Sequence, residues 1–163
     1  DGVPTGGGGG VIQVVFGSTT TQAVRAHPNI GGYDTHVFDT NLSATITPKF
    51  STSKIFVQAF QNYSFTNGSS TQMQGNLFIC DGNNNILDGR DIDFDMLRVK
   101  NLTSFAGICP LQLLHSPNTT SAFTYKIRAN FYYCEGGSSG QMILQNGNRE
   151  NTVSTISLME ISA

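Results

Sequence analysis

Hydrophobic and polar residues alternate with a period of two along much of the chain. Between residues 123 and 133 every second side chain is apolar, in the series Phe123, Tyr125, Ile127, Ala129, Phe131 and Tyr133. A shorter run at 42–47 alternates in the same way and stops at Pro48, which cannot donate a hydrogen bond to a sheet. Because successive side chains of a strand point to opposite faces, these runs predict strands with one face in a core.

The same kind of pattern, bounded by clusters of Gly, Asn, Asp, Ser and Pro, predicts further strands. Their ranges are 11–16, 18–24, 54–65, 76–81, 105–114, 141–145 and 152–161. A total of about eight to ten strands with such turns is typical of a sandwich or a jelly roll. We therefore predict an all-β fold: a single-domain antiparallel β-sandwich of the jelly-roll type.

The first ten residues, DGVPTGGGGG, differ from the rest of the chain. Consecutive glycines have no side chain to bury and leave the backbone very free, so this stretch cannot pack alone. We interpret residues 1–10 as a Gly-rich linker that joins the domain to something upstream. Residues 11–163 are then the β-sandwich domain.

Two of the predicted strands, 54–65 and 152–161, are apolar on both faces. A strand of this kind is covered on both sides, and the outer face of a two-layer sandwich is covered either by another subunit or by an internal loop. We favour another subunit, so the pattern predicts an oligomer. The residues predicted for its interface are Phe56, Phe60, Ile156 and Leu158.

Charge is scarce in this chain. Only 12% of residues are charged and the formal net charge is −2, against about 25% charged in an average protein. The basic residues are scattered, so a nucleic-acid partner is not expected. No apolar run approaches the roughly 18 residues that cross a bilayer, so membrane insertion is not expected either.

The three cysteines, Cys80, Cys109 and Cys134, each lie within or at the end of an apolar strand-like run, and no CxxC pair occurs. Isolated cysteines in such runs are typical of buried, reduced thiols and not of a disulfide framework. This usage fits a protein that is made and assembled in a cytoplasm.

One acidic stretch could bind a metal. If it is extended, Asp91, Asp93 and Asp95 project from one face, and three carboxylates could hold a hard cation such as Ca²⁺. The alternative, which we favour, is a solvated acidic face neutralised by nearby arginines. Residues 81–85 match the start of a calcium loop but lack its later Gly and Glu, so a tight hairpin turn explains them better. No cofactor is expected.

An enzyme is not expected, and no catalytic residues are assigned. A glycan hydrolase needs two carboxylates that flank a cleft, and the glutamates are dispersed in the sequence. No Gly-x-Ser-x-Gly motif occurs either. Exposed aromatic rings and amide side chains could instead bind a glycan, although each candidate also has an interpretation as a packing or turn residue. The candidates are Tyr33, Asn83, Asn85, Phe94 and Tyr132.

Several segments resemble a family of phage virion proteins of the tail-fibre or capsid-fibre kind, with a C-terminal jelly-roll domain. They are VIQVVFGSTTTQ, FDTNLSATITPKFSTSKIFVQ, NLFICDGNNNIL, LLHSPNTTSAFTYKIRANF and NTVSTISLMEIS. The order of segments is also similar to a tumour-necrosis-factor-type jelly roll, in which a closing strand packs at a trimer axis. The region 84–104 matches nothing in the family.

The resemblance implies a homotrimeric fibre domain that contacts other virion proteins and mediates attachment to the host cell surface, where a glycan is a possible partner. It also implies a location in the virion, after assembly in the host cytoplasm. Two alternatives stay open. One is a capsid decoration protein that stabilises the shell, and the other is a carbohydrate-binding module without a viral context.

Overall fold

The computed structural model describes residues 9–28, 31–66, 70–92, 96–102, 104–136, 140–146 and 152–162. Within these ranges the chain forms strands and no helix, so there is no helix that could cross a membrane. The strands are β1 (Val11–Thr19), β2 (Ala23–Ala26), β3 (Gly32–Tyr33), β4 (Val37–Ile46), β5 (Lys54–Thr66), β6 (Ser70–Asp81), β7 (Leu97–Lys100), β8 (Ser104–His115), β9 (Phe123–Gly136), β10 (Gln141–Leu144) and β11 (Ser154–Ile161).

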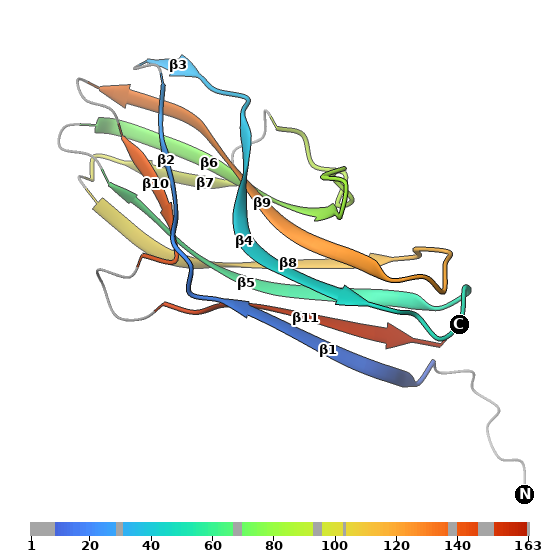
Figure 1. The fold of residues 1–163 in the computed structure, drawn as a ribbon. Coiled ribbons are helices and arrows are strands. Elements are labelled where there is room, and N and C mark those ends of the chain that lie inside the picture. Colours follow the sequence, from blue (N-terminus) through green and yellow to red (C-terminus); the bar gives the residue numbers. More distant parts are fainter. Residues whose placement is uncertain are drawn as a thin grey trace, which may run out of the picture.

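The strands form two antiparallel sheets (Figure 1). In sheet 1, β11 and β10 pair one after the other with the same edge of β5. Strand β1 pairs with β11, and β2 pairs with β10. Across sheet 1 the strands therefore occupy four positions, in the order β1/β2, β11/β10, β5 and β8. Sheet 2 has the order β4/β3, β9, β6 and β7.

The order in which the chain visits these strand positions defines a jelly roll. Along the chain the eight positions are β1/β2, β3/β4, β5, β6, β7, β8, β9 and β10/β11. With this numbering, sheet 1 has the order 1-8-3-6 and sheet 2 has the order 2-7-4-5. The chain crosses from one sheet to the other at every step except between β6 and β7. Two interlocked Greek keys of this kind make a jelly roll, and the predicted β-sandwich is confirmed.

The core lies between the two sheets and follows the period of two in the sequence. In β4, the buried side chains of Leu42 and Ile46 alternate with exposed residues, and in β9 Tyr125 and Ile127 are buried in the same way. The inner face of β5 continues this core. The alternation identified these inner faces because only one face of each of these strands meets the opposite sheet.

A β-bulge in β9 makes one prediction wrong. Gln74 of β6 pairs with Tyr133, whereas Asn76 pairs with Asn130, so one residue of β6 stands opposite two residues of β9. The extra residue shifts the alternation by one position. Cys134 is consequently buried in the core, and Tyr133, which we predicted to lie there, is only half-buried.

The prediction that Ile156 and Leu158 belong to a subunit interface is also wrong. Both side chains are fully buried and belong to the core between the sheets, so they are not available to another subunit. The opposite face of β11, which includes the half-buried Met159, is the outer one. A strand that is apolar on both faces does not reveal from its sequence which face meets the opposite sheet, and here we chose the wrong one.

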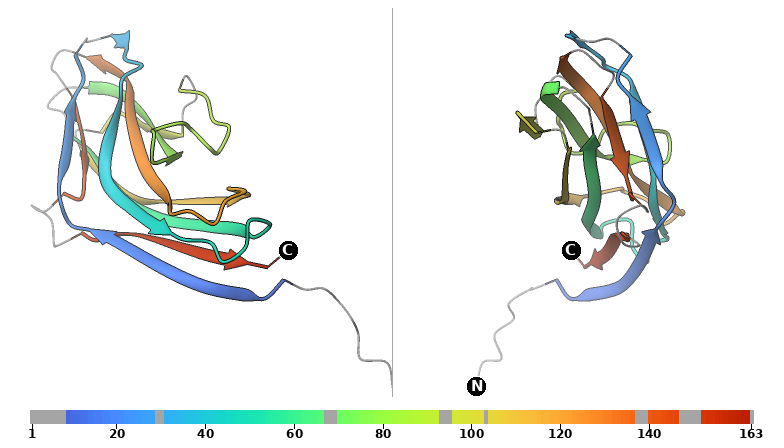
Figure 2. Two further views of the ribbon diagram at one scale, coloured as in Figure 1. Left: turned by 45° about the vertical axis from the view of Figure 1, so that its right-hand side comes forward. Right: turned by 90° about the vertical axis from the view of Figure 1, so that its left-hand side faces the viewer.

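Both ends of the described chain lie at the same end of the sandwich. The backbone nitrogen of Ser162 donates to the carbonyl oxygen of Gly10 at 3.1 Å. Strand β3 lies at the opposite end, as the views in Figures 1 and 2 show. Residues 1–8 of the predicted linker lie outside the described residues.

Candidate functional site

The outer face of sheet 1 carries an apolar surface built from cross-strand rows. In one row, Val14 pairs with Met159, Met159 with Phe56, and Phe56 with Leu114. The next row joins Phe16 to the polar residues Ser157, Gln58 and Gln112, and the row after it joins Ser18 and Thr155 to Phe60 and Pro110. None of the residues in the three rows is charged. We define the apolar face by its large side chains, which are Val14, Phe16, Phe56, Phe60, Ile108, Leu114 and Met159.

Several side chains of the apolar face are strongly exposed. Phe16 is 77% exposed, Ile108 is 62% exposed and Phe60 is 43% exposed. The structure thus places Phe56 and Phe60 on the outer face, as the alternation of 54–65 indicated. Sandwich strands normally alternate inward apolar residues with outward polar ones, so a group of exposed apolar side chains on an uncharged part of the outside is a sign of an interaction site.

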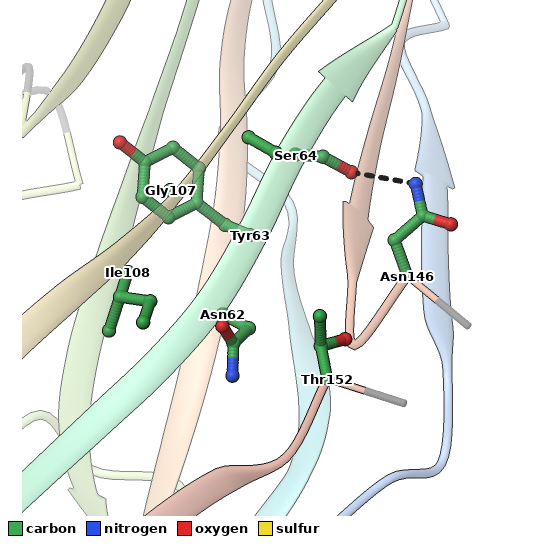
Figure 3. Close-up of a pocket in the computed structure, with 8 residues that line it drawn as sticks. Asn62, Tyr63, Ser64, Gly107, Ile108, Asn146 and Thr152 are labelled. Carbon is green, nitrogen blue, oxygen red and sulfur yellow. Dashed lines mark hydrogen bonds between the residues drawn. The ribbon is translucent and has the colours of Figure 1, made fainter. Parts of the chain in front are cut away.

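A cavity of about 210 Å³ opens beside the apolar face, where β10 and β11 separate along β5 (Figure 3). The residues that line it are uncharged. The amide nitrogen of Asn146 donates to the hydroxyl oxygen of Ser64 at 3.2 Å, and the amide nitrogen of Asn62 donates to the carbonyl oxygen of Val153 at 2.6 Å. Among the residues that the structure describes, the lining is a neutral, largely apolar hollow.

Three tyrosines form a cluster at the β3 end of sheet 2. The ring centroid of Tyr33 lies 5.0 Å from that of Tyr132 and 5.1 Å from that of Tyr133, and Tyr33 is 65% exposed. Tyr33 and Tyr132 were both ligand candidates in the sequence, and the fold brings them into contact. Tyr133 was missed because the bulge in β9 is not visible in the alternation.

The backbone around this tyrosine cluster is firmly held. The backbone nitrogen of Asp34 donates to the carbonyl oxygen of Tyr132 at 2.8 Å, and Gly31 donates to Cys134 at 2.7 Å. The carboxylate of Asp34 accepts a hydrogen bond from Arg25 at 2.7 Å. Burial alone would raise the pKa of Asp34, but the hydrogen bond from Arg25, the hydrogen bond from the backbone nitrogen of His36 and the charge of Arg25 outweigh it and hold the pKa below its usual value.

Hydrogen-bonding side chains flank the tyrosine cluster on sheet 2. Tyr133 pairs across the sheet with Gln74, which pairs in turn with Arg98. Arg98 donates to the side-chain oxygen of Gln72 at 3.0 Å, and Gln72 pairs with Glu135. Lys100 also pairs with Gln72, so amide, basic and acidic side chains share this part of sheet 2 with the cluster.

The acidic stretch is only partly described. Asp91 is exposed, while Asp93, Phe94 and Asp95 lie outside the described residues. The buried carboxylate of Asp88 accepts a hydrogen bond from the backbone nitrogen of Ile79 at 3.0 Å, which ties this segment to β6. In the part of the chain that is described, no three His, Cys, Asp or Glu side chains come together as a metal site would require.

The hairpin turn after β6 has the geometry that the sequence favoured. The carboxylate of Asp81 accepts hydrogen bonds from the backbone nitrogens of Asn83 and Asn85, each at 2.8 Å, and from the side chain of Asn85, also at 2.8 Å. Asn84 adopts a positive φ of 72°. The ligand candidates Asn83 and Asn85 thus contribute to the closure of the turn.

The comparisons with known proteins add little to these observations. No family model matches the chain, and no curated protein matches it. Among solved structures, the chain is similar to capsid structures of infectious bursal disease virus. The Gx strain matches at 12% identity and a TM-score of 0.43, the VP2 subviral particle at 12% and 0.40, and the Gt strain at 11% and 0.38.

These matches cover 92%, 94% and 93% of this chain and 38% of each of the viral chains. The chain therefore spans well under half the length of the proteins that it matches. The assignment of the fold rests on the strand order and register described above. On that basis the chain is a jelly-roll β-sandwich.

Proposed function

We propose that this chain is a structural domain of a virus particle, of the phage-fibre kind, which assembles as a homotrimer through the apolar face and mediates attachment to the host surface. The observation that carries this proposal is the uncharged apolar surface on the outside of sheet 1. Fully burying one Leu, Ile or Phe side chain contributes about 1.5–3 kcal/mol, so covering this face favours association strongly.

A second copy of the chain is the occupant we propose for the apolar face. The face is nearly free of charge, as the buried centre of a subunit interface is, whereas a partner of opposite charge would have nothing to pair with here. Soluble oligomers are mostly closed and symmetric, and three copies match the trimer implied by the resemblance to fibre proteins.

The attachment role is supported by the positions of the chain ends and the tyrosine cluster. Gly10 and Ser162 lie at one end of the sandwich, and β3 with Tyr33 lies at the other. A domain held to a particle through either chain end would present the tyrosine cluster outward. Contacts with other virion proteins would then be made at the end near Gly10.

Light scattering tests the assembly. The purified chain should have a mass of about three times 17.5 kDa. Phe60→Asp should reduce this mass to that of a monomer, because the buried charge would have no partner. Lys126→Asp, on the outer face of sheet 2, should leave the trimer intact. A soluble wild-type monomer, or equal behaviour of the two variants, would contradict the assembly.

Labelled electron microscopy of the particle tests the virion role. Label on a fibre supports attachment, label spread over the shell supports the alternative of a decoration protein, and the absence of label from the particle removes both. The third alternative, a carbohydrate-binding module without a viral context, would then remain.

A further inference from the structure

We propose that the tyrosine cluster is a binding site for a saccharide, with the ring of Tyr33 stacked on the apolar face of one sugar ring. This inference deepens the attachment role proposed above and rests on it, because it names the class of ligand at the outward end. It concerns sheet 2, on the other side of the sandwich from the apolar face.

The first argument is the chemistry of the surface. A pyranose ring has a face of C–H groups and a rim of hydroxyls, and it needs a flat apolar partner with hydrogen-bonding groups beside it. Tyr33 offers an exposed ring at 65% exposure, packed 5.0 and 5.1 Å from two further tyrosine rings. Tyrosine provides a large, rigid contact surface that is apolar with a polar tip, and this suits it to such contacts.

The second argument is the polar rim. Gln72 on β6, Arg98 on β7 and Glu135 on β9 lie on the same sheet as the cluster, and Arg98 donates to Gln72 at 3.0 Å. Together they present donors and acceptors of both charge signs, which can bond vicinal hydroxyl groups. Lys100 pairs with Gln72 across the sheet, so the rim carries two basic side chains and one acidic side chain and does not by itself select a neutral ligand.

The third argument is preorganisation. The bulge in β9 turns Tyr133 out of the core, and bulges are frequent at functional sites because they redirect a side chain. The Cβ atom of any other residue at Gly75, opposite the bulge, would lie 2.9 Å from the carbonyl oxygen of Asn130. Hydrogen bonds from Gly31 and Asp34 to β9 fix the segment that carries Tyr33. A rigid site loses little entropy when it binds.

Tyrosine fluorescence and ligand-observed NMR, applied to the whole chain, test the proposal. The chain contains five tyrosines and no tryptophan, and three of those tyrosines belong to the cluster, so a bound sugar should change the emission. The probes are methyl glucosides, methyl galactosides and N-acetylglucosamine, each up to about 50 mM, because one shallow site gives millimolar affinity. A printed glycan array identifies the preferred sugar.

Tyr33→Ala should weaken saccharide binding about tenfold or more, because it removes the aromatic contact and the apolar surface that the ring and the sugar would bury together. The matched control is Phe50→Ala, which removes another exposed aromatic ring, 58% exposed, from the turn after β4. Binding by the control should equal that of the wild type, and both variants should keep the wild-type mass in light scattering.

Three results would overturn the inference: no signal from any saccharide or array glycan, equal binding by Tyr33→Ala and the wild type, or equal loss in the two variants. Binding of a protein and not a glycan by the cluster would also overturn it. Saccharide binding by a wild-type monomer would contradict the proposed assembly but not the saccharide site. The experiments therefore distinguish a failure of the assembly from a failure of the binding site.

Discussion

At the scale of single residues, Glu160 is a buried carboxylate that secures the turn between β4 and β5. It accepts hydrogen bonds from the side chain of Gln13 at 2.6 Å and from the backbone nitrogen of Lys49 at 2.7 Å. Burial alone would raise the pKa of Glu160, but the interactions with Ser53, with Gln13 and with the backbone nitrogens of Lys49 and Phe50 outweigh it and lower the pKa below its usual value. A sequence gives no sign of this role, because the donors lie far away along the chain.

The lowered pKa predicts the direction of a pH effect. The stabilisation by ionised Glu160 is complete above the carboxyl pKa of the unfolded chain and is lost as the pH falls through the lower folded value. Glu160→Gln should therefore cost about 1–3 kcal/mol at pH 7, and its deficit relative to the wild type should shrink towards acid pH. Urea unfolding from pH 7 to pH 3 measures both, with the exposed Glu135→Gln as the control. A constant deficit would contradict the prediction.

The cysteines give a second prediction at this scale. All three cysteine side chains are buried and none forms a disulfide bridge, and burial raises the pKa of Cys80 to about 11 and that of Cys109 above its usual value. A thiol that stays protonated reacts slowly. Thiol titration without reductant should therefore find three groups in the denatured chain and very slow reaction in the native one. Two missing thiols in the denatured chain would indicate a disulfide bridge.

At the scale of strands, the sequence was sufficient where one face of a strand is polar. The inner faces of β4 and most of β9 were predicted because their period of two is undisturbed. Strand β7 was missed because only Leu97 and Val99 are buried in it, which is too short a pattern. The close approach opposite the bulge in β9 involves Gly75, which lies in a different strand, so the sequence of β9 alone could not have predicted the bulge.

Strand β1 provides a prediction about close packing between the sheets. The Cβ atom of any residue other than glycine at position 17 would meet the backbone oxygen of Ser43 in β4. Gly17→Ala should therefore destabilise the domain by about 1–3 kcal/mol or more, because the two backbones cannot separate without disturbing the core. Gly10→Ala is the control, since nothing lies within 4 Å of its Cβ position. Equal urea midpoints for the two variants would show that β1 can shift freely.

At the scale of the whole molecule, the two outer faces of the sandwich differ in character. The outside of sheet 1 presents an uncharged apolar face, whereas the β3 end of sheet 2 presents aromatic rings with polar neighbours. The sequence showed that extra apolar surface existed, through Phe56 and Phe60. It did not show that Phe16 and Leu114, from strands far apart in the chain, extend the same face, because this follows from the order of strands in the sheet.

Assembly through the apolar face should make thermal stability depend on protein concentration. Only folded chains associate, so association stabilises the native state by mass action, and the melting temperature rises with concentration. Between about 1 and 100 µM chain, we expect the wild type to gain about 5 °C or more.

Phe16→Asp, at the edge of the apolar face, should melt at a lower temperature that does not change with concentration. Phe50→Asp makes the same change at another exposed phenylalanine, outside the face, and should keep the wild-type dependence. The comparison separates loss of assembly from a general effect of an added charge, because both side chains are largely exposed within one subunit. If Phe16→Asp kept the concentration dependence, the β1 edge of the face would lie outside the interface, and assembly would have to use the side near Ile108 and Leu114.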